Sequence, residues 1–428
     1  MIWADKAVKR FLLVEPDFPI PHKSKNHKDF LPIGLLKIAS YLRSQGHEVS
    51  LVRGIGTSLT DLDWPSETAP DEVWVTSLFT YWASHVREAV QYYKAMFPDA
   101  VVRVGGIYAS LRPPEEVKEY TGCDEVHQGV LPQVEGHATT HFPAYDLIQD
   151  ANPHSVDYQI LHASRGCPRR CPFCGTWKIE PEFEAKESIR DEIRLPKVIF
   201  YDNNFLMNPH IESILRELIE LRNQGEIKWV ESQSGLDGRV LLEKPHLARM
   251  LNEAGFKYPR IAWDWGYDQR YSIKRQIGIL VKAGYKSRDI FVFMLYNHEI
   301  PYEELEKKRA KCWEWRVQIA DCRYRPLDQL YDRYSSYKKS QDARAYHIHP
   351  GWTDKLVRQF RRNVRRQNIC VRYRFRFYSR TLERKRVPRD LARHLRNLRD
   401  KGEIVRLLDA EEIDYWFPDQ LYLPSEVC

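Results

Sequence analysis

The stretch Cys167-Pro-Arg-Arg-Cys171-Pro-Phe-Cys174 decides the fold, because it groups three cysteines at the spacing CxxxCxxC. Three thiolates in one short loop suit a [4Fe–4S] cluster, in which they bind three irons and leave the fourth open to a small ligand. A structural zinc ion needs four protein ligands, and no second CxxC or CxxH pair completes such a set. A disulfide is a poor alternative for so short a loop in a mostly reduced chain. The spacing therefore predicts one cluster, bound by Cys167, Cys171 and Cys174.

The remaining cysteines are scattered and form no second spacing that is typical of a cluster. We expect them to be buried or incidental thiols. They are Cys123, Cys312, Cys322, Cys370 and Cys428.

The size and composition of the chain indicate a globular protein of two or three domains. It has 428 residues, of which 43% are hydrophobic and 12% aromatic. No apolar run approaches the ~20 residues that span a bilayer, and Met1–Lys6 lack the apolar core of a signal peptide. We therefore expect no membrane partner and a cytoplasmic protein, because free thiols and an oxygen-labile cluster survive in that compartment.

Residues 1–135 are predicted to form one domain in which strands and helices alternate. Apolar residues at helical spacing predict a helix over 32–45, and short apolar runs predict strands. The strand candidates are 9–14, 48–52, 72–77 and 101–104. This alternation indicates a doubly wound, mostly parallel sheet, which is a Rossmann-like α/β domain. Ligands bind beyond the carboxyl ends of such strands, so we expect binding loops at 15–31, 77–82 and 105–110.

Residues 136–154 are predicted to be a polar linker, and residues 155–335 a partial (β/α)6 barrel. Six strand candidates alternate there with helical patterns. They are 158–164, 197–201, 227–232, 260–263, 289–295 and 317–320. The cysteine loop follows the first of these strands, at the carboxyl end where such barrels carry their chemistry.

The cysteine spacing, with Phe173 before the last cysteine, resembles the signature of the radical SAM superfamily. The resemblance implies that the open iron binds S-adenosylmethionine (SAM), whose reductive cleavage yields a 5′-deoxyadenosyl radical. It implies that the backbone of Phe173 lies beside the adenine while its ring shields the cluster. It also implies a reducing partner of the flavodoxin or ferredoxin type.

The same resemblance relates polar groups at two strand ends to SAM. Asp202, Asn203 and Asn204 follow the second barrel strand, where the family binds the amino group of the methionine moiety. Their oxygens suit an ammonium, although the sequence departs from the Gly-Gly-Glu type found in many members. An Asx turn that caps the next helix is the structural alternative. Asp264 ends the fourth strand, where the family reaches the SAM ribose, or else it is a surface turn residue.

The N-terminal layout resembles the cobalamin-binding domain of the cobalamin-dependent radical SAM class. The matching pieces are residues 31–36, 46–49, 77–79 and 105–110. The resemblance therefore implies Ser77, Gly105 and Gly106 as cobalamin contacts. The chain has no DxHxxG sequence, so no histidine is offered as a lower axial ligand, and many members of the class lack it too. Two interpretations stay open: cobalamin is a further cofactor, or the domain is vestigial and only caps the barrel.

The charge of the chain is unevenly distributed. The net charge is +7, yet residues 355–401 hold 18 Lys and Arg against 3 Asp and Glu, a net of +15 that leaves about −8 elsewhere. This block lies in a segment, 336–428, that we expect to be basic and α+β. Strict alternation over 371–378 predicts a strand that places Arg372, Arg374 and Arg376 on one face. That face fits an anionic substrate, a nucleic acid or an acidic protein, and packing against the acidic remainder is the alternative.

The sequence thus predicts an enzyme that cleaves SAM at a [4Fe–4S] cluster. It abstracts a hydrogen atom from a substrate or, with cobalamin, transfers a methyl group. Methylthiotransferases of tRNA share the cysteine spacing but carry three further cluster cysteines in their N-terminal domain, whereas the first 122 residues here contain no cysteine. The alternatives are a nucleic-acid-binding or redox-sensing iron–sulfur protein that does not cleave SAM, and an RNA-modifying radical SAM enzyme. The substrate and the catalytic residues are not readable from the sequence.

Overall fold

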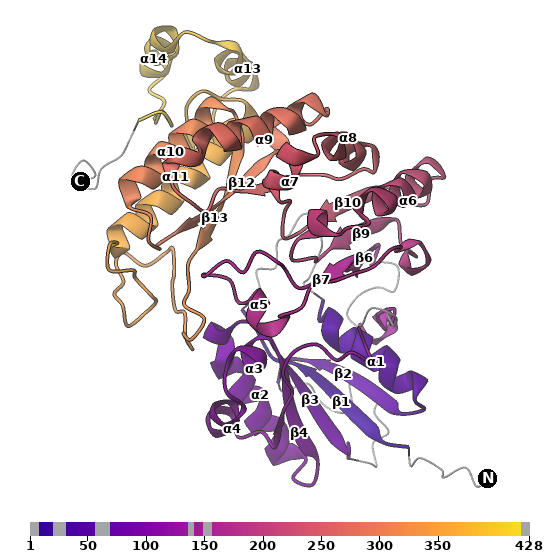
Figure 1. Ribbon diagram of the computed structural model, residues 1–428. Helices are drawn as coiled ribbons and strands as arrows, with labels where there is room; N and C mark the ends of the chain where they lie inside the picture. Colours follow the sequence, from indigo (N-terminus) through magenta and orange to yellow (C-terminus); the bar gives the residue numbers. More distant parts are fainter. Residues whose placement is uncertain (1–7, 20–30, 56–68, 136–140, 149–155, 421–428) are drawn as a thin grey trace.

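The computed structural model describes residues 8–19, 31–55, 69–135, 141–148 and 156–420 (Figure 1). The start of the chain over Met1–Lys6, residues 20–30 of the first predicted binding loop, most of the predicted linker and Cys428 lie outside the described residues. Within the described ranges, no helix combines the length and the apolar character needed to cross a bilayer.

The N-terminal body is a five-stranded parallel sheet in the order β2-β1-β3-β4-β5. Its strands are β1 (Arg10–Glu15), β2 (Glu48–Arg53), β3 (Glu72–Ser77), β4 (Val101–Gly106) and β5 (Glu125–Val126). Its helices are α1 (Ile33–Ser44), α2 (Ala83–Met96), α3 (Ile107–Leu111) and α4 (Pro114–Thr121). The order confirms the predicted doubly wound sheet, whose topological switch point lies between β1 and β3.

Strand β1 is buried on both faces, as expected for the centre of a parallel sheet. Leu12 and Val14 point into a core shared with α2 and α4, whereas Phe11 and Leu13 point into a core shared with α1. The second core also contains residues of the next body, namely Tyr158, Ile160 and Ile199. The two bodies therefore pack against each other through a common apolar cluster.

The second body is the partial barrel that the sequence predicts. Parallel strands form two sheets, β10-β9-β6 and β11-β12-β13. Isolated parallel bridges, Val230 to Phe256 and Leu236 to Ile261, connect these sheets. The strands are β6 (Tyr158–Leu161), β9 (Lys197–Phe200), β10 (Trp229–Ser232), β11 (Arg260–Ala262), β12 (Phe291–Tyr296) and β13 (Gln318–Arg323). A short antiparallel hairpin, β7 (Ser164–Arg165) and β8 (Glu184–Ala185), lies beside them.

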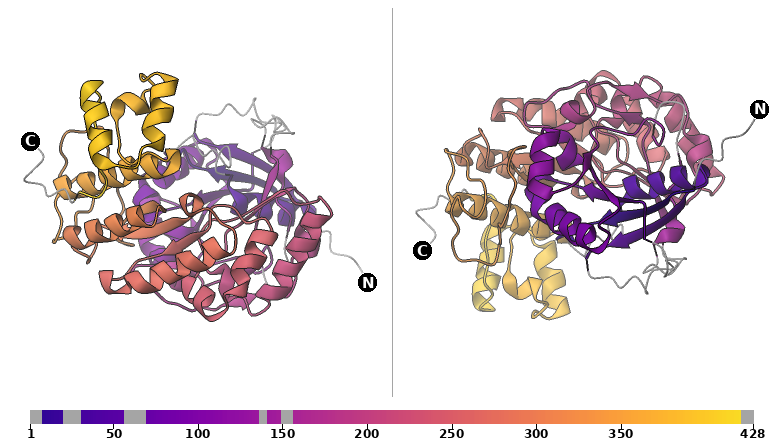
Figure 2. Two further views of the ribbon diagram at one scale, coloured as in Figure 1. Left: turned by 90° about the horizontal axis from the view of Figure 1, so that it is seen from above. Right: turned by 90° about the horizontal axis from the view of Figure 1, so that it is seen from below.

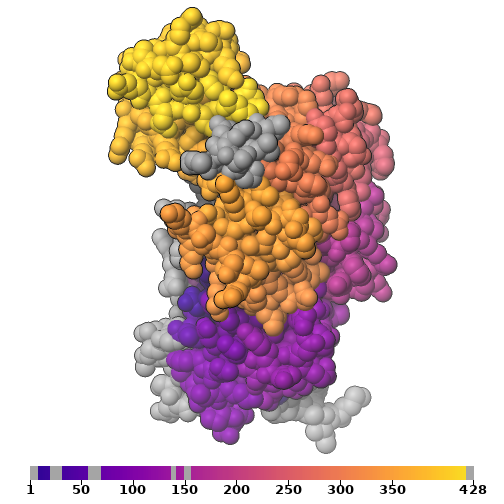
Figure 3. Space-filling model, turned by 90° about the vertical axis from the view of Figure 1, so that its left-hand side faces the viewer, coloured from indigo at the N-terminus to yellow at the C-terminus, as the bar shows by residue number. Residues whose placement is uncertain are grey.

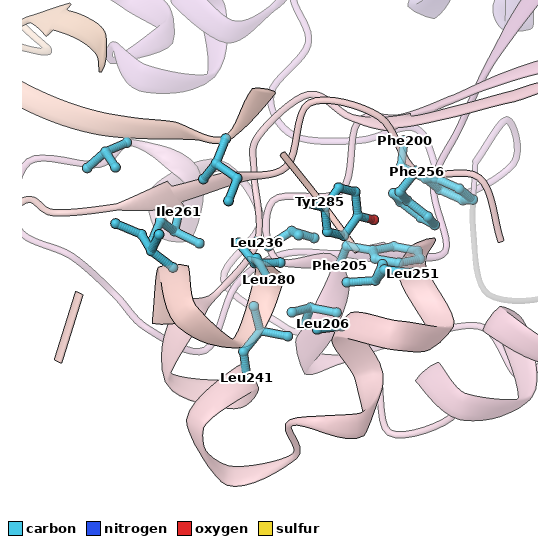
Figure 4. Packing of buried hydrophobic residues seen from close by; sticks show 14 of the residues in the cluster. Phe200, Phe205, Leu206, Leu236, Leu241, Leu251, Phe256, Ile261, Leu280 and Tyr285 are labelled. Atoms are coloured by element: carbon cyan, nitrogen blue, oxygen red, sulfur yellow. The ribbon is translucent and has the colours of Figure 1, made fainter. Parts of the chain in front are cut away.

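Helices cover the outside of the barrel (Figure 2). They are α6 (Ile211–Asn223), α7 (Gly238–Glu243), α8 (His246–Glu253), α9 (Arg270–Lys282) and α10 (Tyr302–Glu314). Apolar residues recur on one side of α6, where Ile214, Leu218 and Leu221 are buried, and this stripe faces the strands. The rings of Phe200, Phe205 and Phe256 meet inside, with centroids 4.6–5.9 Å apart (Figure 4).

The C-terminal segment is helical, with α11 (Asp354–Tyr373), α12 (Arg380–Glu383), α13 (Arg389–Asn397) and α14 (Lys401–Ala410). Helices α12–α14 surround a small core of their own and project from the barrel (Figures 1 and 3). The predicted strand over 371–378 is wrong. Val371–Tyr373 complete α11, Arg374 ends it in the left-handed conformation (φ 66°), and an isolated bridge joins Tyr378 to Trp416. Arg372, Arg374 and Arg376 therefore do not form one face of a strand.

Candidate functional site

The cysteine loop lies at the carboxyl ends of the barrel strands, between β7 and the short helix α5 (Thr176–Ile179). Helix α5 packs against α3 of the N-terminal body, so the loop faces the carboxyl edge of that sheet (Figure 1). Close packing continues at Gly175, where an added Cβ would lie 3.2 Å from Leu111. The loop thus sits between the two bodies.

All three cysteines of the loop are half-buried free thiols. The amide of Cys174 donates to the carbonyl of Cys171 over 3.0 Å, and the indole of Trp177 donates to the same carbonyl over 3.1 Å. Burial, followed by the charge of Cys174, raises the pKa of Cys171. Such a pair of neighbouring thiolates is stabilised by bound iron. In the described part of the chain, no three His, Cys, Asp or Glu side chains are close enough to hold one metal ion, whereas a [4Fe–4S] cluster binds each thiolate on a separate iron.

Glu180 ties the entry of the loop to its exit. Its carboxylate accepts from Arg165 over 2.5 Å, from the amide of Gly166 over 2.7 Å and from Asn203 over 3.2 Å. Gly166 has a φ of 74°, and a Cβ there would lie 2.0 Å from the carbonyl of Glu182. The chain therefore needs glycine directly before Cys167.

Asp202 is fully buried and serves the backbone. Its carboxylate accepts from the amide of Ala163 over 3.0 Å, and from the amide and hydroxyl of Ser164 over 2.6 and 2.7 Å. Burial raises the pKa of Asp202 to about 6, although these hydrogen bonds lower it. The side chain anchors the turn between β6 and β7, so its oxygens are already engaged.

Within the Asp-Asn-Asn group, Asn204 makes a direct contact with a cysteine sulfur. Its Nδ2 lies 3.8 Å from the sulfur of Cys167 and donates to Asp237 over 3.2 Å. A carboxylate only accepts, so this contact sets the orientation of the amide. The opposite atom, Oδ1, is buried and has no hydrogen-bond partner within the described residues. Asn203 instead contacts Thr176 and Glu180.

Two arginines bracket Asp237, the N-cap of α7. Arg169 donates to it over 2.8 Å and Arg239 over 2.9 Å. Burial raises the pKa of Asp237, but Arg239, Asn204 and Arg169 together hold it below its ordinary value. The charges of Cys171 and Cys167 also act on Arg239. Sequence reasoning missed Arg239, and its only signal was its position two residues after the N-cap aspartate.

Asp264 lies in the turn that follows β11, half-buried and without a hydrogen bond to the described residues. Burial raises its pKa to about 6, while Lys308 and Arg239 lower it. The ammonium of Lys308 donates to the carbonyls of Trp263 and Trp265 over 2.6 and 2.9 Å, which fixes this turn. The charge of Asp264 acts on Cys171, so the structure places this predicted residue near the cysteine loop.

Phe173 contacts aromatic side chains that sequence reasoning missed. Its ring lies 6.0 Å from Trp265 and 6.1 Å from His298, and His298 lies 4.3 Å from Tyr324. Asn297, buried with a φ of 58°, donates to the carbonyl of His347 over 2.8 Å and holds that segment beside the strand end. The sequence signal that could have identified this aromatic group was His298, which follows the end of the fifth barrel strand.

Ser77, Gly105 and Gly106 are built into the N-terminal sheet. The hydroxyl of Ser77 donates to the carbonyl of Gly105 over 2.6 Å and accepts from the amide of Ala109 over 3.2 Å. Gly106 has a φ of 94°, and its Cβ would lie 2.2 Å from the carbonyl of Ser77. These residues shape the turn into α3, and direct contact with cobalamin stays a prediction. Ile107 and Phe79 are exposed near this turn.

Comparison with known proteins gives one family match. Residues 161–307 match the family model described as "Radical SAM superfamily". No curated protein matches the chain.

The solved structures that are similar to this chain include the following two. One is the apo form of the cobalamin-dependent S-adenosylmethionine radical enzyme OxsB, with 15% identity, a TM-score of 0.46, and coverage of 72% of this chain and 52% of that one. The other is a cobalamin-binding protein from Desulfitobacterium hafniense DCB-2, with 20% identity, a TM-score of 0.22, and coverage of 30% and 56%. The chain thus spans about half the length of either structure.

Proposed function

We propose, on the premise that residues 161–307 form a radical SAM domain, that this chain cleaves SAM reductively at a [4Fe–4S] cluster. Cys167, Cys171 and Cys174 would hold the cluster. The cluster, when bound, supplies the electron that breaks a carbon–sulfur bond of SAM to give methionine and the 5′-deoxyadenosyl radical. Phe173, within the loop, would lie beside the adenine.

The observation that carries the proposal is that Asn204, which contacts Cys167, has a buried Oδ1 with no hydrogen-bond partner in the described part of the chain. Leaving such an acceptor unpaired costs about 1–3 kcal/mol, so a ligand that donates a hydrogen bond there is favoured. The ammonium of the methionine moiety is a suitable donor. Asp264, which lies near Cys171, is the proposed acceptor for the ribose hydroxyls of the same molecule.

The surrounding charges suit a site that takes up electrons. Arg169 and Arg239 meet at Asp237 beside the thiols, and a cation near an anionic cluster stabilises its reduced form. The electron donor is proposed to be of the flavodoxin or ferredoxin type. The substrate and the fate of the radical stay open in this proposal.

We further propose that the N-terminal sheet binds cobalamin, which would add methyl transfer to hydrogen abstraction. The carboxyl edge of this sheet, where doubly wound sheets bind ligands, faces the cysteine loop. Near that edge Phe79 is 42% exposed and Ile107 is 38% exposed, and apolar side chains of this kind suit the face of a corrin. A vestigial domain is the competing interpretation.

Cluster loading tests the first proposal. Anaerobic reconstitution should load about four irons and four sulfides per chain, and reduction should then release 5′-deoxyadenosine from SAM. Replacing Cys167, Cys171 or Cys174 with Ala should abolish both, whereas Cys322→Ala and Cys370→Ala are matched controls that should retain both. A full cluster in Cys171→Ala would refute the ligand assignment. A full cluster without 5′-deoxyadenosine would favour the redox-sensing alternative.

Cobalamin retention tests the second proposal. Protein incubated anaerobically with hydroxocobalamin and passed over a desalting column should keep the corrin absorbance. Phe79→Asp should lose it, because a charge would replace an apolar contact. Tyr271→Asp changes another exposed aromatic side chain, on α9 (66% exposed against 42% for Phe79), and it should have no effect. If the unmodified protein retains no corrin, the domain is vestigial and methyl transfer is excluded.

A further inference from the structure

The basic segment divides into two groups of cations with different surroundings. Those of α11 take part in packing. Arg361 lies over the ring of Tyr334 at 5.5 Å, Arg372 donates to Gln318 on β13 over 3.1 Å, and Arg358 pairs with Asp354 over 3.1 Å. The long side chains on this helix therefore help to attach the C-terminal segment to the barrel.

The second group extends from the end of α12 to the end of α13. Arg384, Lys385, Arg386, Arg389 and Arg399 are all exposed. Within the described ranges, none of the five has a carboxylate at 4.0 Å or less. These residues are called the basic face below. Because these five side chains are exposed and form no close ion pair with the described residues, they are accessible to an external anion.

Like charges add to the positive potential at one end of the basic face. Burial and then the charge of Arg376 lower the pKa of Arg316, Arg399 lowers it further, and Cys370 and Asp419 partly counteract these effects. The Nε of Arg376 is buried without a hydrogen-bond partner among the described residues. The guanidinium groups of Arg316, Arg376 and Arg399 thus lie in one region, and the buried Nε–H of Arg376 is an unused donor. An anion with several oxygens would accept from that donor and offset the shared positive charge.

The supporting fold makes a membrane surface a poor partner for this face. Helices α12–α14 turn their apolar residues inward, where Leu395, Ile404 and Leu408 are fully buried in a common core. Between residues 374 and 414, no large hydrophobic side chain is exposed. A helix that lies on a membrane needs an exposed apolar side. The stretch that carries the basic face has no such apolar side, and the exposed residues Tyr373 and Tyr415 lie directly outside it.

We propose that the basic face binds the sugar–phosphate backbone of a nucleic acid. Four of its five cations are arginines, whose planar guanidinium matches a phosphate with two parallel hydrogen bonds. Tyr373 and Tyr415, which are 51% and 40% exposed on the same segment, could stack on unpaired bases, so a single strand is the favoured form. The carboxylates of an acidic protein would also pair with the guanidinium groups, but such a protein offers no unpaired bases to stack on the two tyrosines.

The basic face lies far from the cysteine loop along the barrel. Helix α11 begins near the carboxyl end of β12, where Trp352 contacts Tyr296, and ends near Gln318, the first residue of β13. Helices α12–α14, which follow α11, therefore adjoin the amino ends of the strands, opposite the candidate active site (Figure 1). The face is a docking surface rather than a wall of the active site, and the proposal does not rest on the proposed function.

Binding of labelled nucleic acids by the full chain tests the proposal. The probes are a 20-nucleotide single-stranded RNA and a DNA duplex of the same length, measured by fluorescence anisotropy from 50 to 300 mM salt. The test variant carries Arg384→Gln, Lys385→Gln, Arg386→Gln and Arg389→Gln. It should weaken RNA binding by about tenfold or more at 50 mM salt and reduce the slope of log K against log salt by up to about 3.

Matched controls separate the basic face from charge in general. Lys274→Gln, Arg275→Gln, Lys282→Gln and Lys286→Gln remove the same charge from an exposed part of the barrel and should leave binding unchanged. Cys171→Ala should also bind normally, since the face is remote from the cysteine loop. If the fourfold variant loses helical content, the double variant Arg386→Gln, Arg389→Gln replaces it. It removes half as many charges and should weaken RNA binding by a correspondingly smaller factor.

Several outcomes would overturn the proposal. The first is that the unmodified protein binds neither RNA nor DNA. The second is that the control variant with four barrel charges removed loses as much RNA affinity as the test variant. The third is that Cys171→Ala loses RNA affinity. Tighter binding to a polyglutamate peptide than to RNA would identify an acidic protein as the partner instead. Tighter binding to vesicles with anionic lipid would identify a membrane surface.

Discussion

Asp202 and Asn204 stand two positions apart after β9, yet their oxygens have opposite surroundings. Asp202 accepts three hydrogen bonds from residues 163 and 164, whereas the Oδ1 of Asn204 has no partner among the described residues. The first side chain is occupied by the fold, and the second is available to a ligand. Of the three adjacent polar residues, Asn204 is therefore the one that we propose for the SAM ammonium.

Replacing Asn204 with Ala should raise the KM for SAM about 10- to 100-fold, because a hydrogen bond to a charged group contributes about 1.5–3 kcal/mol. The measurement is 5′-deoxyadenosine formation against SAM concentration, with iron content as the check on cluster loading. Asp202→Ala should instead lower the urea midpoint, since it leaves buried amides unpaired. An unchanged KM in Asn204→Ala would contradict the assignment.

Gly105 and Gly106 are neighbours in sequence but differ in the space that each has. A Cβ at Gly106 would lie 2.2 Å from the carbonyl of Ser77, whereas at Gly105 its nearest neighbour is His127 at 3.8 Å. Gly106→Ala should therefore lower the free energy of unfolding by about 1–3 kcal/mol or more, the usual cost of a forced backbone. Gly105→Ala should change it little. Urea unfolding measures both, and equal stability of the two variants would contradict this account.

At the scale of elements, the cysteine loop depends on residues outside the motif. Glu180 follows α5 and connects Arg165 and Gly166, which precede Cys167, to Asn203, which follows β9. Three separate segments are therefore held in register by one carboxylate. Groups of this kind orient metal ligands and are needed for tight binding of the metal.

Glu180→Gln should weaken cluster retention by about tenfold, the lower end of the effect of losing a supporting group around a metal site. Iron release to a chelator under anaerobic conditions measures it. Glu182→Gln is the matched control, because Glu182 is exposed two residues away and makes no side-chain ion pair with the described residues. Similar iron release from both variants would show that Glu180 does not support the loop.

At the scale of the whole molecule, buried charges join the N-terminal body to the barrel. Lys37 of α1 pairs with Glu135, and Lys186 of the barrel lies 3.7 Å from the same carboxylate. All three are buried. Burial lowers the pKa of Lys37, while Glu135 counteracts that effect. Together with the shared apolar core, this cluster fixes the cysteine loop against the N-terminal sheet.

Glu135→Ala should lower the free energy of unfolding by about 3–5 kcal/mol, because it leaves the buried ammonium of Lys37 without its carboxylate, whereas Lys186 keeps Glu192. Glu125→Ala removes the partner of Arg103 on the surface and should cost less than about 1 kcal/mol. Thermal and urea unfolding measure the difference. A small loss in Glu135→Ala would mean that the apolar core alone joins the two bodies.

Local patterns in the sequence determined the cysteine loop, the doubly wound sheet and the six barrel strands. Each of these rests on residues close together in the chain: a thiol spacing, an apolar run or a helical stripe. The strand prediction over 371–378 was wrong for the converse reason. Val371 completes an apolar stripe with Val357, Phe360 and Val364 that packs on the barrel, and this long-range burial outweighs the local alternation.

Only the tertiary structure decided which polar groups of the site are available. Asp202 and Asn204 both looked suited to an ammonium, and their roles separate once contacts with residues 163, 164 and 237 are known. Arg239 on α7, Lys308 on α10 and His298 after β12 reach the site from three different parts of the chain and carry no motif. Whether a hydrogen-bonding atom is free depends on partners distant in the chain. A spacing of cysteines can therefore identify the chemistry, but the folded barrel assigns the groups around it.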